Sequence, residues 1–305
     1  MKALITGSAG FVGTYLTEEL HNAGYEVIGF DRVKKPGTIQ GDLLDADFIK
    51  ASIHEEKPDV IFHLAAMADV GLSWKKPQQA FELNVIATIN LMEAVRAFGE
   101  KPIKLIMVGS SDQYGHLGAS GISVNEEVAV EPASPYAVSK KAQEDIAKVS
   151  GKSYGLEICM TRSFNHGGAG QKTGFMIPDF ASGIVKIERG ESRELLVGNL
   201  SSKRDFTHVK DVVRAYRLIA EKGDPGQIYN VGSGKTWSAQ EILDQLCSMA
   251  KCTIPVRQDP CRMRPSDTPV ICCDHSKLTL HTGWTPVYSM MDILTDTLSY
   301  YRNQK

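Results

Sequence analysis

The sequence lacks the patterns that mark several classes of protein. It contains no apolar run of about 18 residues, the length that a membrane-spanning helix requires, so no membrane partner is expected. Its 34 Lys and Arg residues are balanced by 36 Asp and Glu, a formal net charge of -2, and no basic run or stripe stands out. A nucleic-acid partner is therefore not expected. Internal repeats, low-complexity tracts and long linkers are absent as well.

The cysteines form no pattern typical of a metal site or a redox motif. None of the six belongs to a C-x-x-C motif, and the adjacent pair Cys272-Cys273 has no second pair to complete a zinc site. We expect free thiols in a reducing compartment and no bound metal. The first predicted strand begins within two residues of Met1, so no signal peptide is expected and the protein is predicted to be cytoplasmic.

What the chain does contain is the composition of a globular protein. Its 305 residues are 42% hydrophobic and 23% charged, enough for one large α/β domain and a smaller appended one.

Three glycines follow the first apolar run. Residues 3–5 lead into Gly7, Gly10 and Gly13 at G-x-x-G-x-x-G spacing, and an amphipathic segment begins directly afterwards. This order predicts a strand, a tight turn and a helix. Gly7 permits the turn, Gly10 lets backbone approach a pyrophosphate, and Gly13 allows the helix to pack close to the strand. The free N–H groups at the helix start then favour phosphate binding.

An acidic residue supports this interpretation. The apolar run 26–30 ends in Asp31, 18 residues beyond Gly13, where a carboxylate accepts hydrogen bonds from a ribose diol. The alternative is an ordinary glycine-rich turn with no bound nucleotide.

Strand-like and helix-like stretches alternate along the first 165 residues, and the pattern loosens beyond them. Expected strands at 59–66, 104–109 and 157–162 are separated by expected helices at about 45–57, 77–98 and 135–154. This alternation predicts a doubly wound parallel sheet of the Rossmann type, with its ligand cleft at the carboxyl ends of the strands. The stretches Leu64-Ala65-Ala66, Ser110 and Asn165 each follow such an end.

The second half of the chain is expected to hold a smaller α/β substrate domain. Residues 1–165 are assigned to the dinucleotide-binding domain and residues 166–305 mostly to the substrate domain, with segments near 204–235 rejoining the large sheet. Within that part, helices are expected at about 177–190, from 209 to about 222, at 238–250 and at 289–302.

A tyrosine and a lysine stand one helical turn apart. Ser134 suits a helix N-cap and Pro135 the first helical position, so Tyr136 and Lys140 fall on one face. An ammonium near a phenol lowers the pKa of the tyrosine, which would let it exchange a proton near neutral pH. Such pairs are also common on inert helix surfaces. Ser110 or its neighbour could hold a substrate oxygen, or simply cap the turn.

Together, the glycines, Ser110 and Tyr136-x-x-x-Lys140 resemble the extended short-chain dehydrogenase/reductase family, in its nucleotide-sugar branch. The motif His63-Leu64-Ala65-Ala66 and Asn84-Val85 match as well. The resemblance implies that Tyr136 is the acid/base, Lys140 orients the nicotinamide ribose and Ser110 binds the reacting oxygen. The residues that the resemblance places against NADPH or NADH are Gly7, Gly10, Phe11, Val12, Gly13, Asp31, Arg32, Asp42, Leu43, Leu64, Ala65, Ala66, Tyr136 and Lys140.

The later motifs resemble members that process GDP-mannose. The matching segments are 163–166, 198–200, 203–206 and 262–267. The resemblance implies a GDP-sugar substrate, and arginines suit the clamping of its phosphates, although surface ion pairs would explain them equally. The residues implied in substrate binding are Ser111, Asp112, Asn165, Asn199, Arg204, Arg262 and Arg264.

Two activities in that group remain open. One is reduction of the C4 ketone of GDP-4-keto-6-deoxy-D-mannose to GDP-D-rhamnose; the other is 4,6-dehydration of GDP-mannose. The relatives that dehydrate carry a glutamate where this chain has Asp112, which favours the reductase. A nucleotide-sugar epimerase and a non-catalytic dinucleotide sensor are the other candidates, although the complete Ser110, Tyr136 and Lys140 set argues against a sensor.

Two neighbouring residues bear on the choice between NADH and NADPH, and the resemblance bears on the association of two copies of the chain. Asp31 favours NADH and the adjacent Arg32 favours NADPH, so both stay open. A homodimer is implied, through a four-helix bundle of the helices at 77–98 and 135–154.

Overall fold

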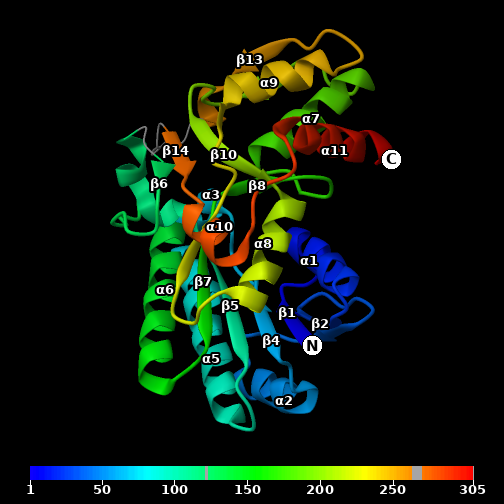
Figure 1. Cartoon of the computed structure of the whole chain (residues 1–305). Helices are drawn as coiled ribbons and strands as arrows, with labels where there is room; N and C mark the ends of the chain where they lie inside the picture. Colours follow the sequence, from blue (N-terminus) through cyan, green and yellow to red (C-terminus); the bar gives the residue numbers. More distant parts are fainter. Residues whose placement is uncertain (121–122, 263–269, 305) are drawn as a thin grey trace.

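A parallel sheet of seven strands forms the centre of the molecule, a computed structural model that describes residues 1–120, 123–262 and 270–304 (Figure 1). The strand order is β11-β7-β5-β4-β1-β2-β3, and every neighbouring pair is parallel. The order reverses between β1 and β4, so the loops after these strands diverge and leave a crevice. The strands are β1 Lys2–Thr6, β2 Glu26–Asp31, β3 Thr38–Gln40, β4 Val60–His63, β5 Lys104–Ser110, β7 Ile158–Ser163 and β11 Ile228–Val231.

Alternating apolar side chains hold helices on both faces of this sheet. In β1, Ala3 and Ile5 join a core with α1 and α8, whereas Leu4 joins the core with α2, α5 and α6. This two-residue period is what a strand covered on both sides requires. The doubly wound sheet predicted from the sequence is therefore confirmed. The flanking helices are α1 Phe11–Asn22, α2 Ala46–Glu56, α5 Ala87–Phe98, α6 Pro135–Tyr154, α8 Val209–Lys222 and α10 Ser276–Thr282.

The helix starts follow the capping residues seen in the sequence. The Ser134 hydroxyl accepts the N–H of Ala137 at 3.1 Å, and Pro135 is the first residue of α6. Asp45 caps α2 in the same way through the N–H of Phe48. These caps satisfy N–H groups that have no partner inside the helix, which fixes where each helix begins.

The prediction of one uninterrupted helix at 77–98 is wrong in one respect. The structure has α4 Pro77–Phe81, a π-type turn η1 Glu82–Ile86 and then α5. Asn84 is buried within this wider turn; its amide accepts the N–H of Met67 at 2.7 Å and donates to Ser139 Oγ at 2.9 Å. A single five-residue π-type turn is too short to change the hydrophobic pattern of the helices on either side, so the sequence pattern did not reveal it.

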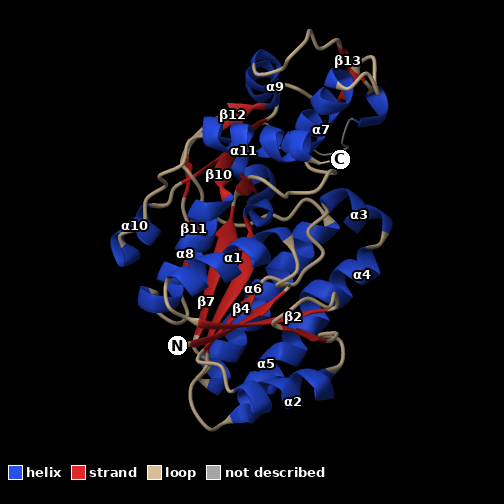
Figure 2. Cartoon of the chain, turned by 90° about the vertical axis from the view of Figure 1, so that its right-hand side faces the viewer, coloured by secondary structure: helices blue, strands red, loops and turns tan. Residues whose placement is uncertain are grey.

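The remaining elements build a second layer beyond the carboxyl edge of the sheet. Figure 2 shows α7, α9 and α11 gathered at the end opposite α2 and α5. A five-stranded sheet includes the path β12-β10-β14-β6, with β8 paired to β10, and α7, α9 and α11 share a separate apolar core. These elements are η2 Ser111–Ser120, β6 Ser123–Val124, β8 Asn165–Gly167, α7 Met176–Glu188, β9 Leu195–Val197, β10 Lys203–His208, β12 Thr236–Ser238, α9 Ala239–Ser248, β13 Val256–Gln258, η3 Pro260–Arg262, β14 Val270–Cys273 and α11 Met290–Asn303. The short helix α3 Val70–Lys75 packs instead against α4 and α6.

The chain passes between the two layers more than once. After β10, the helix α8 packs on α1 and β11 pairs with β7, so the segment 209–231 lies with the large sheet. The division into residues 1–165 and 166–305 stays a prediction.

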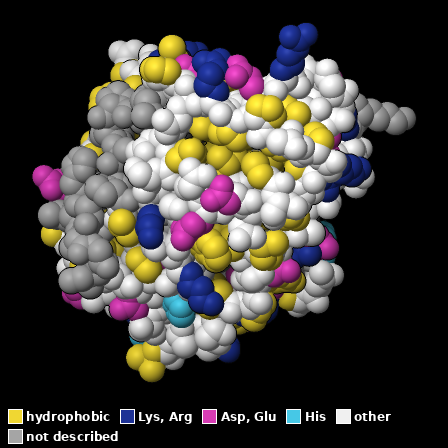
Figure 3. Space-filling view, turned by 90° about the horizontal axis from the view of Figure 1, so that it is seen from above, with side chains coloured by type: hydrophobic (Ala, Val, Ile, Leu, Met, Phe, Trp, Pro, Cys, Tyr) yellow, Lys and Arg dark blue, Asp and Glu magenta, His cyan; other side chains and the backbone are white. Residues whose placement is uncertain are grey.

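Two surface properties complete the description. Within the described ranges, no helix combines the length and apolarity needed to cross a membrane. Viewed from the end that carries α9 and β13, the described Lys and Arg side chains lie singly or in small groups, around a band of apolar side chains (Figure 3).

Candidate active site

The glycine-rich turn between β1 and α1 is packed so closely that two of its glycines admit no side chain. Gly7 has φ +75°, and a Cβ there would lie 2.9 Å from the Ala65 nitrogen. A Cβ on Gly13 would lie 2.3 Å from the Gly7 oxygen and 2.7 Å from the Ser8 Cα. Gly10 is different, because a Cβ there would meet only the Gly7 oxygen, at 3.1 Å. Gly10 also lines the adjoining cavity, which leaves space for a ligand to approach the backbone.

We expect Gly13→Ala to weaken dinucleotide binding at least about tenfold and to lower the free energy of unfolding by about 1–3 kcal/mol, because the turn must move away from the new methyl group. Dinucleotide fluorescence titration and urea unfolding measure the two effects. Gly151→Ala in α6 is the matched control: its Cβ would meet the Leu156 oxygen at an ordinary 3.4 Å, and alanine favours a helix. Equal stability and affinity for Gly13→Ala and the wild type would contradict this account of the turn.

Most of the predicted cofactor residues line one cavity. It has a volume of about 230 Å³ and lies at the crevice between β1 and β4. Its walls include Gly7, Gly10, Asp31, Arg32, Asp42, Leu43, Leu64, Ala65 and Ala66. Phe11, Val12 and Gly13 follow on the first turn of α1. A larger hollow of about 460 Å³ between α7 and α11 contains none of the predicted catalytic or cofactor residues.

Asp31 already has backbone partners in this cavity. Its Oδ2 accepts the N–H of Ala9 at 2.9 Å and its Oδ1 accepts the N–H of Val33 at 2.9 Å. The carboxylate thus braces the glycine turn, and its remaining lone pairs face the cavity that a ribose would fill. Lys35, which the sequence reasoning missed, donates to the oxygen of the same Ala9 at 3.1 Å.

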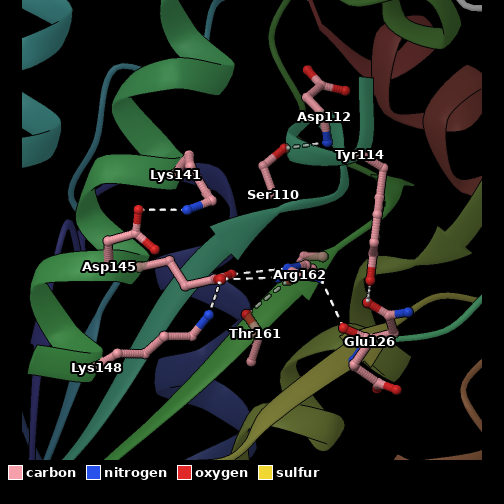
Figure 4. Close-up of polar contacts among 12 residues, drawn as sticks. Ser110, Asp112, Tyr114, Glu126, Lys141, Asp145, Lys148, Thr161 and Arg162 are labelled. Atoms are coloured by element: carbon pink, nitrogen blue, oxygen red, sulfur yellow. Dashed lines mark hydrogen bonds and ion pairs between the residues drawn. The ribbon is translucent and has the colours of Figure 1, made fainter. Parts of the chain in front are cut away.

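The three predicted catalytic residues come together at the carboxyl edge of the sheet. Ser110 ends β5, Tyr136 and Lys140 lie on the first turns of α6, and all three are buried. Ser110 Oγ accepts the N–H of Asp112 at 3.2 Å (Figure 4), so its own hydroxyl proton remains available to donate.

The pKa of Tyr136 departs from the sequence-based expectation. Burial is the main cause that raises it above the usual value near 10, and the negative charge of Asp112 adds to the rise. A hydrogen bond with Ser110 acts in the opposite direction and is weaker. The expectation that Lys140 lowers this pKa is wrong for this structure, because burial and Asp112 prevail. The phenol is therefore protonated at neutral pH, as a proton donor must be.

Lys140 is held by the protein on two sides. Its Nζ donates to the Val108 oxygen at 2.8 Å and to Gln143 Oε1 at 2.9 Å. Burial lowers the pKa of its ammonium to about 7. Lys140 can thus change its charge in the physiological range.

His63 gives the site a pH-dependent stability. Burial, assisted by the charge of Lys140, lowers the pKa of His63 to about 3, whereas an exposed histidine in the unfolded chain titrates near 6.5. Between these values the unfolded chain takes up a proton that the native protein does not, so stability falls as the pH falls. From pH 7 to pH 5 the expected loss from this group is about 2 kcal/mol.

Urea unfolding at the two pH values measures this loss. A His63→Asn variant should lose about 2 kcal/mol less than the wild type over the same range, since the other histidines are unchanged. An identical loss in both proteins would mean that His63 does not stay neutral.

The predicted substrate residues that the structure describes lie beyond the carboxyl ends of the large sheet, in the second layer. Ser111 and Asp112 begin η2, directly after Ser110; Ser111 is buried and Asp112 exposed. Asn165 is exposed on β8, next to Phe206 of β10. Asn199 accepts the N–H and the hydroxyl of Ser201 at 3.0 and 2.8 Å.

Two of the three predicted arginines, Arg204 on β10 and Arg262 on η3, belong to the same layer. Arg204 and the buried Asp205 are successive residues of β10 and so face opposite sides; the Asp205 carboxylate accepts N–H groups of Ser233, Gly234 and Cys273. Arg262 is about half exposed and lies 3.9 Å from Asp259, a weak surface ion pair. Arg264 lies outside the described residues. Ligand contacts of these arginines stay predictions.

One ion pair that the sequence reasoning missed supports the catalytic helix from behind. Arg162 of β7 and Glu144 of α6 are both almost fully buried and form two parallel hydrogen bonds of 2.9 Å. Lys148 adds a further contact to Glu144 at 2.7 Å, and the Arg162 guanidinium lies over the ring of Tyr114 (Figure 4). The sequence signal was present: Tyr136, Lys140 and Glu144 are spaced by four along one helix face.

Comparison with known proteins fits this geometry. A family model described as GDP-mannose 4,6 dehydratase matches residues 4–297. The chain belongs to the GDP-mannose 4,6 dehydratase family. It is an extended short-chain dehydrogenase/reductase, as its motifs predicted, and therefore an enzyme of the oxidoreductase type.

Relatives with three different activities are similar to this chain along its whole length. GDP-6-deoxy-D-mannose reductase of Pseudomonas aeruginosa is 31% identical over 99% of this chain and 98% of its own. GDP-mannose 4,6-dehydratase of Vibrio cholerae is 28% identical over 97% and 92%. The UDP-glucose 4-epimerase of Mycolicibacterium smegmatis is 30% identical over 100% and 99%. Identity at this level shows the family and leaves the reaction open.

Two solved structures confirm the fold. RMD from Pseudomonas aeruginosa, complexed with NADPH, superposes with a TM-score of 0.89 at 31% identity, over 99% of this chain and 98% of that one. UDP-glucose 4-epimerase of Thermus thermophilus, complexed with NAD, gives 0.89 at 29% identity over 99% of each chain. The expected cofactor type, NADPH or NADH, is therefore confirmed for the family.

Proposed function

We propose that this protein is an NAD(P)H-dependent reductase that converts the C4 ketone of GDP-4-keto-6-deoxy-D-mannose into the alcohol, giving GDP-D-rhamnose. The observation that carries the proposal is the Tyr136 phenol, which is buried, protonated and hydrogen-bonded to Ser110. Reduction of a ketone needs a proton donor beside the oxygen that becomes the hydroxyl. The full-length similarity to a GDP-6-deoxy-D-mannose reductase supports this choice of substrate.

The residues around the turn fit a dinucleotide. Gly7 and Gly13 have no room for a Cβ, and Gly10 and Asp31 both line the adjoining cavity. This arrangement suits phosphates at the start of α1 and a ribose at Asp31. Arg32 lines the same cavity and is the candidate partner for a 2′-phosphate.

The catalytic residues then have separate tasks. The dinucleotide, when bound, supplies the hydride that the carbonyl carbon receives. Tyr136 donates its phenolic proton to the C4 oxygen, and Ser110 donates a hydrogen bond to the same oxygen as negative charge develops there. In its charged form, Lys140 places a positive charge one helical turn from Tyr136, which stabilises the phenolate left after proton transfer.

Dehydration of GDP-mannose is the second candidate, and one observation favours it. The negative charge of Asp112 raises the pKa of Tyr136, so a carboxylate acts on the catalytic tyrosine. A dehydratase needs such a group as the base that removes the C5 proton. Asp112 is one methylene shorter than the glutamate expected there, which leaves reduction as the first choice.

Oxidation of NADH and NADPH, followed by absorbance with GDP-4-keto-6-deoxy-D-mannose, tests the proposal. Stoichiometric oxidation and a GDP-deoxyhexose product are expected. If GDP-mannose is consumed instead, without net oxidation, the protein is the dehydratase and Asp112→Asn should abolish activity. Retention of cofactor through purification provides a further check, because dehydratases and epimerases must recycle it in place, whereas a reductase must exchange it.

We also propose that the protein forms a homodimer through the helices α4, α5 and α6. Apolar side chains are exposed along these helices and the turn η1, among them Phe81, Ile86, Val138 and Val149. Exposed apolar side chains gathered on neighbouring helices favour association with a second copy.

A further inference from the structure

A continuous chain of buried hydrogen bonds runs from the catalytic lysine to the wall of the dinucleotide cavity. Lys140 Nζ donates to Gln143 Oε1 at 2.9 Å, and Gln143 Nε2 donates to Thr88 Oγ1 at 3.0 Å. Thr88 Oγ1 lies 2.9 Å from His63 Nε2, and His63 Nδ1 lies 2.8 Å from Thr6 Oγ1. The side chains come from α6, α5, β4 and β1, and each is at most 3% exposed.

Every proton in this chain has one consistent position. The Thr88 hydroxyl donates to the Asn84 oxygen at 2.9 Å, so Thr88 must accept from both Gln143 and His63. His63 is consequently protonated on Nε2, and its Nδ1 accepts from the hydroxyl of Thr6. Thr6 in turn accepts the N–H of Ala65, a residue of the cavity wall, at 3.3 Å.

The orientation of the Gln143 amide follows from the same constraints. Turned the other way, its NH₂ group would face the Lys140 ammonium and its oxygen would face the Thr88 oxygen, and both contacts would be repulsive. With the Val108 oxygen, Gln143 occupies two of the three N–H donors of Lys140, and among the side chains that the structure describes, in residues 1–115, 123–262 and 270–304, no third partner occurs. The third donor is the one that can reach a ligand.

We propose that Gln143 is a positioning residue for the catalytic lysine: its amide, fixed by Thr88 and His63, sets the location and the charge state of the Lys140 ammonium. The proposal deepens the proposed function, on which its catalytic meaning rests. An amide at this place accepts a hydrogen bond without adding charge, so it holds the ammonium and still lets it lose a proton near the pKa of about 7 that burial gives it.

Few titratable groups surround this lysine. Tyr136 lies one turn earlier on α6, and His63 at the end of β4 is neutral, with its pKa lowered to about 3. Glu144 is the next residue after Gln143, but its carboxylate is bound to Arg162 and Lys148. The group at position 143 is therefore the contact that can change the titration of Lys140 most directly.

The test is the titration midpoint of Lys140, measured by NMR on protein with ¹³C-labelled lysine and assigned with a Lys140→Met variant. Gln143→Glu should raise the midpoint by about one to three units, because a carboxylate then pairs with the ammonium while the Thr88 hydroxyl turns to donate. Gln143→Met, which has similar length and no acceptor, should lower it. Ala142→Glu is the matched control, since it adds the same charge one residue away on a different face of α6, and it should leave the midpoint unchanged.

The pH profile of turnover should move in the same direction as the midpoint in each variant. Unchanged midpoints in both Gln143 variants would overturn the proposal, as would an equal shift in the control. If Gln143→Glu does not fold, Gln143→Asn, whose amide is withdrawn by one methylene, must lower the midpoint as Gln143→Met does. The NMR measurement needs no substrate, so its result is independent of whether the proposed reduction is correct.

Discussion

Tyr136→Phe is expected to lower turnover by about 10²–10⁴-fold while dinucleotide binding stays nearly unchanged. The substitution removes only the phenolic oxygen, and with it the proton that the developing alkoxide would receive. The ring remains packed in its buried site, so the cavity at the glycine turn is not disturbed. Steady-state kinetics and dinucleotide fluorescence titration measure the two quantities separately.

Another buried tyrosine provides the control for this experiment. Tyr229 is fully buried on β11, and its hydroxyl accepts the N–H of Asp224 at 3.0 Å, at the amino end of the strand and away from the cleft. Tyr229→Phe should cost about 1 kcal/mol of stability and leave turnover intact. Full activity in Tyr136→Phe would mean that another group donates the proton.

Glu144→Leu is expected to lower the free energy of unfolding by about 3–5 kcal/mol, the largest stability effect that we predict. The Arg162 guanidinium would remain buried at 4% exposure without its carboxylate partner. Burial raises the pKa of Glu144, but the hydrogen bonds and charges of Arg162 and Lys148 together outweigh it and keep the pKa below its usual value. Urea unfolding at neutral pH gives the measurement.

Lys148, the more exposed partner of the Glu144 carboxylate, allows the effect of burial to be distinguished from the effect of charge alone. Lys148 also contacts Glu144 but is 38% exposed, so Lys148→Ala should cost no more than about 1 kcal/mol. A double variant, Glu144→Leu with Arg162→Met, should recover much of the loss, because neither charge is then left buried alone. A loss in Glu144→Leu as small as in Lys148→Ala would show that water reaches Arg162.

The sequence predicted those parts of the molecule that depend on local spacing. The glycine turn, the start of α6 at Ser134 and the two-sided burial of the strands all follow from residues a few positions apart, and the structure has them. The strand β3 was missed because its three residues carry too short a pattern. The π-type turn around Asn84 was missed because it is too short to alter the helical pattern and because the backbone partner of Asn84, Met67, lies on another loop.

The properties that depend on packing between distant segments were not accessible. The pKa of Tyr136 was predicted in the wrong direction, because helical spacing shows that Lys140 is near but not how deeply the phenol is buried. The second sheet joins residues 123–124, 203–208 and 270–273, whose strands are too short and too far apart in the chain to be paired from sequence. For the same reason the sequence of α6 could not predict the partners of Gln143, which are Thr88 on α5 and Met107 on β5.

The late return of β11 to the large sheet has a consequence for synthesis of the protein. All six residues of β7 are buried, and one edge of that strand is covered only by residues 228–231. A ribosome adds about 5–20 residues per second, so this edge of β7 stays unpaired for several seconds while the segment between β7 and β11 is synthesised. An uncovered apolar strand is a template for pairing with another chain. Fragments that stop near residue 165 should therefore aggregate, and soluble yield should depend on how quickly the following segment is translated.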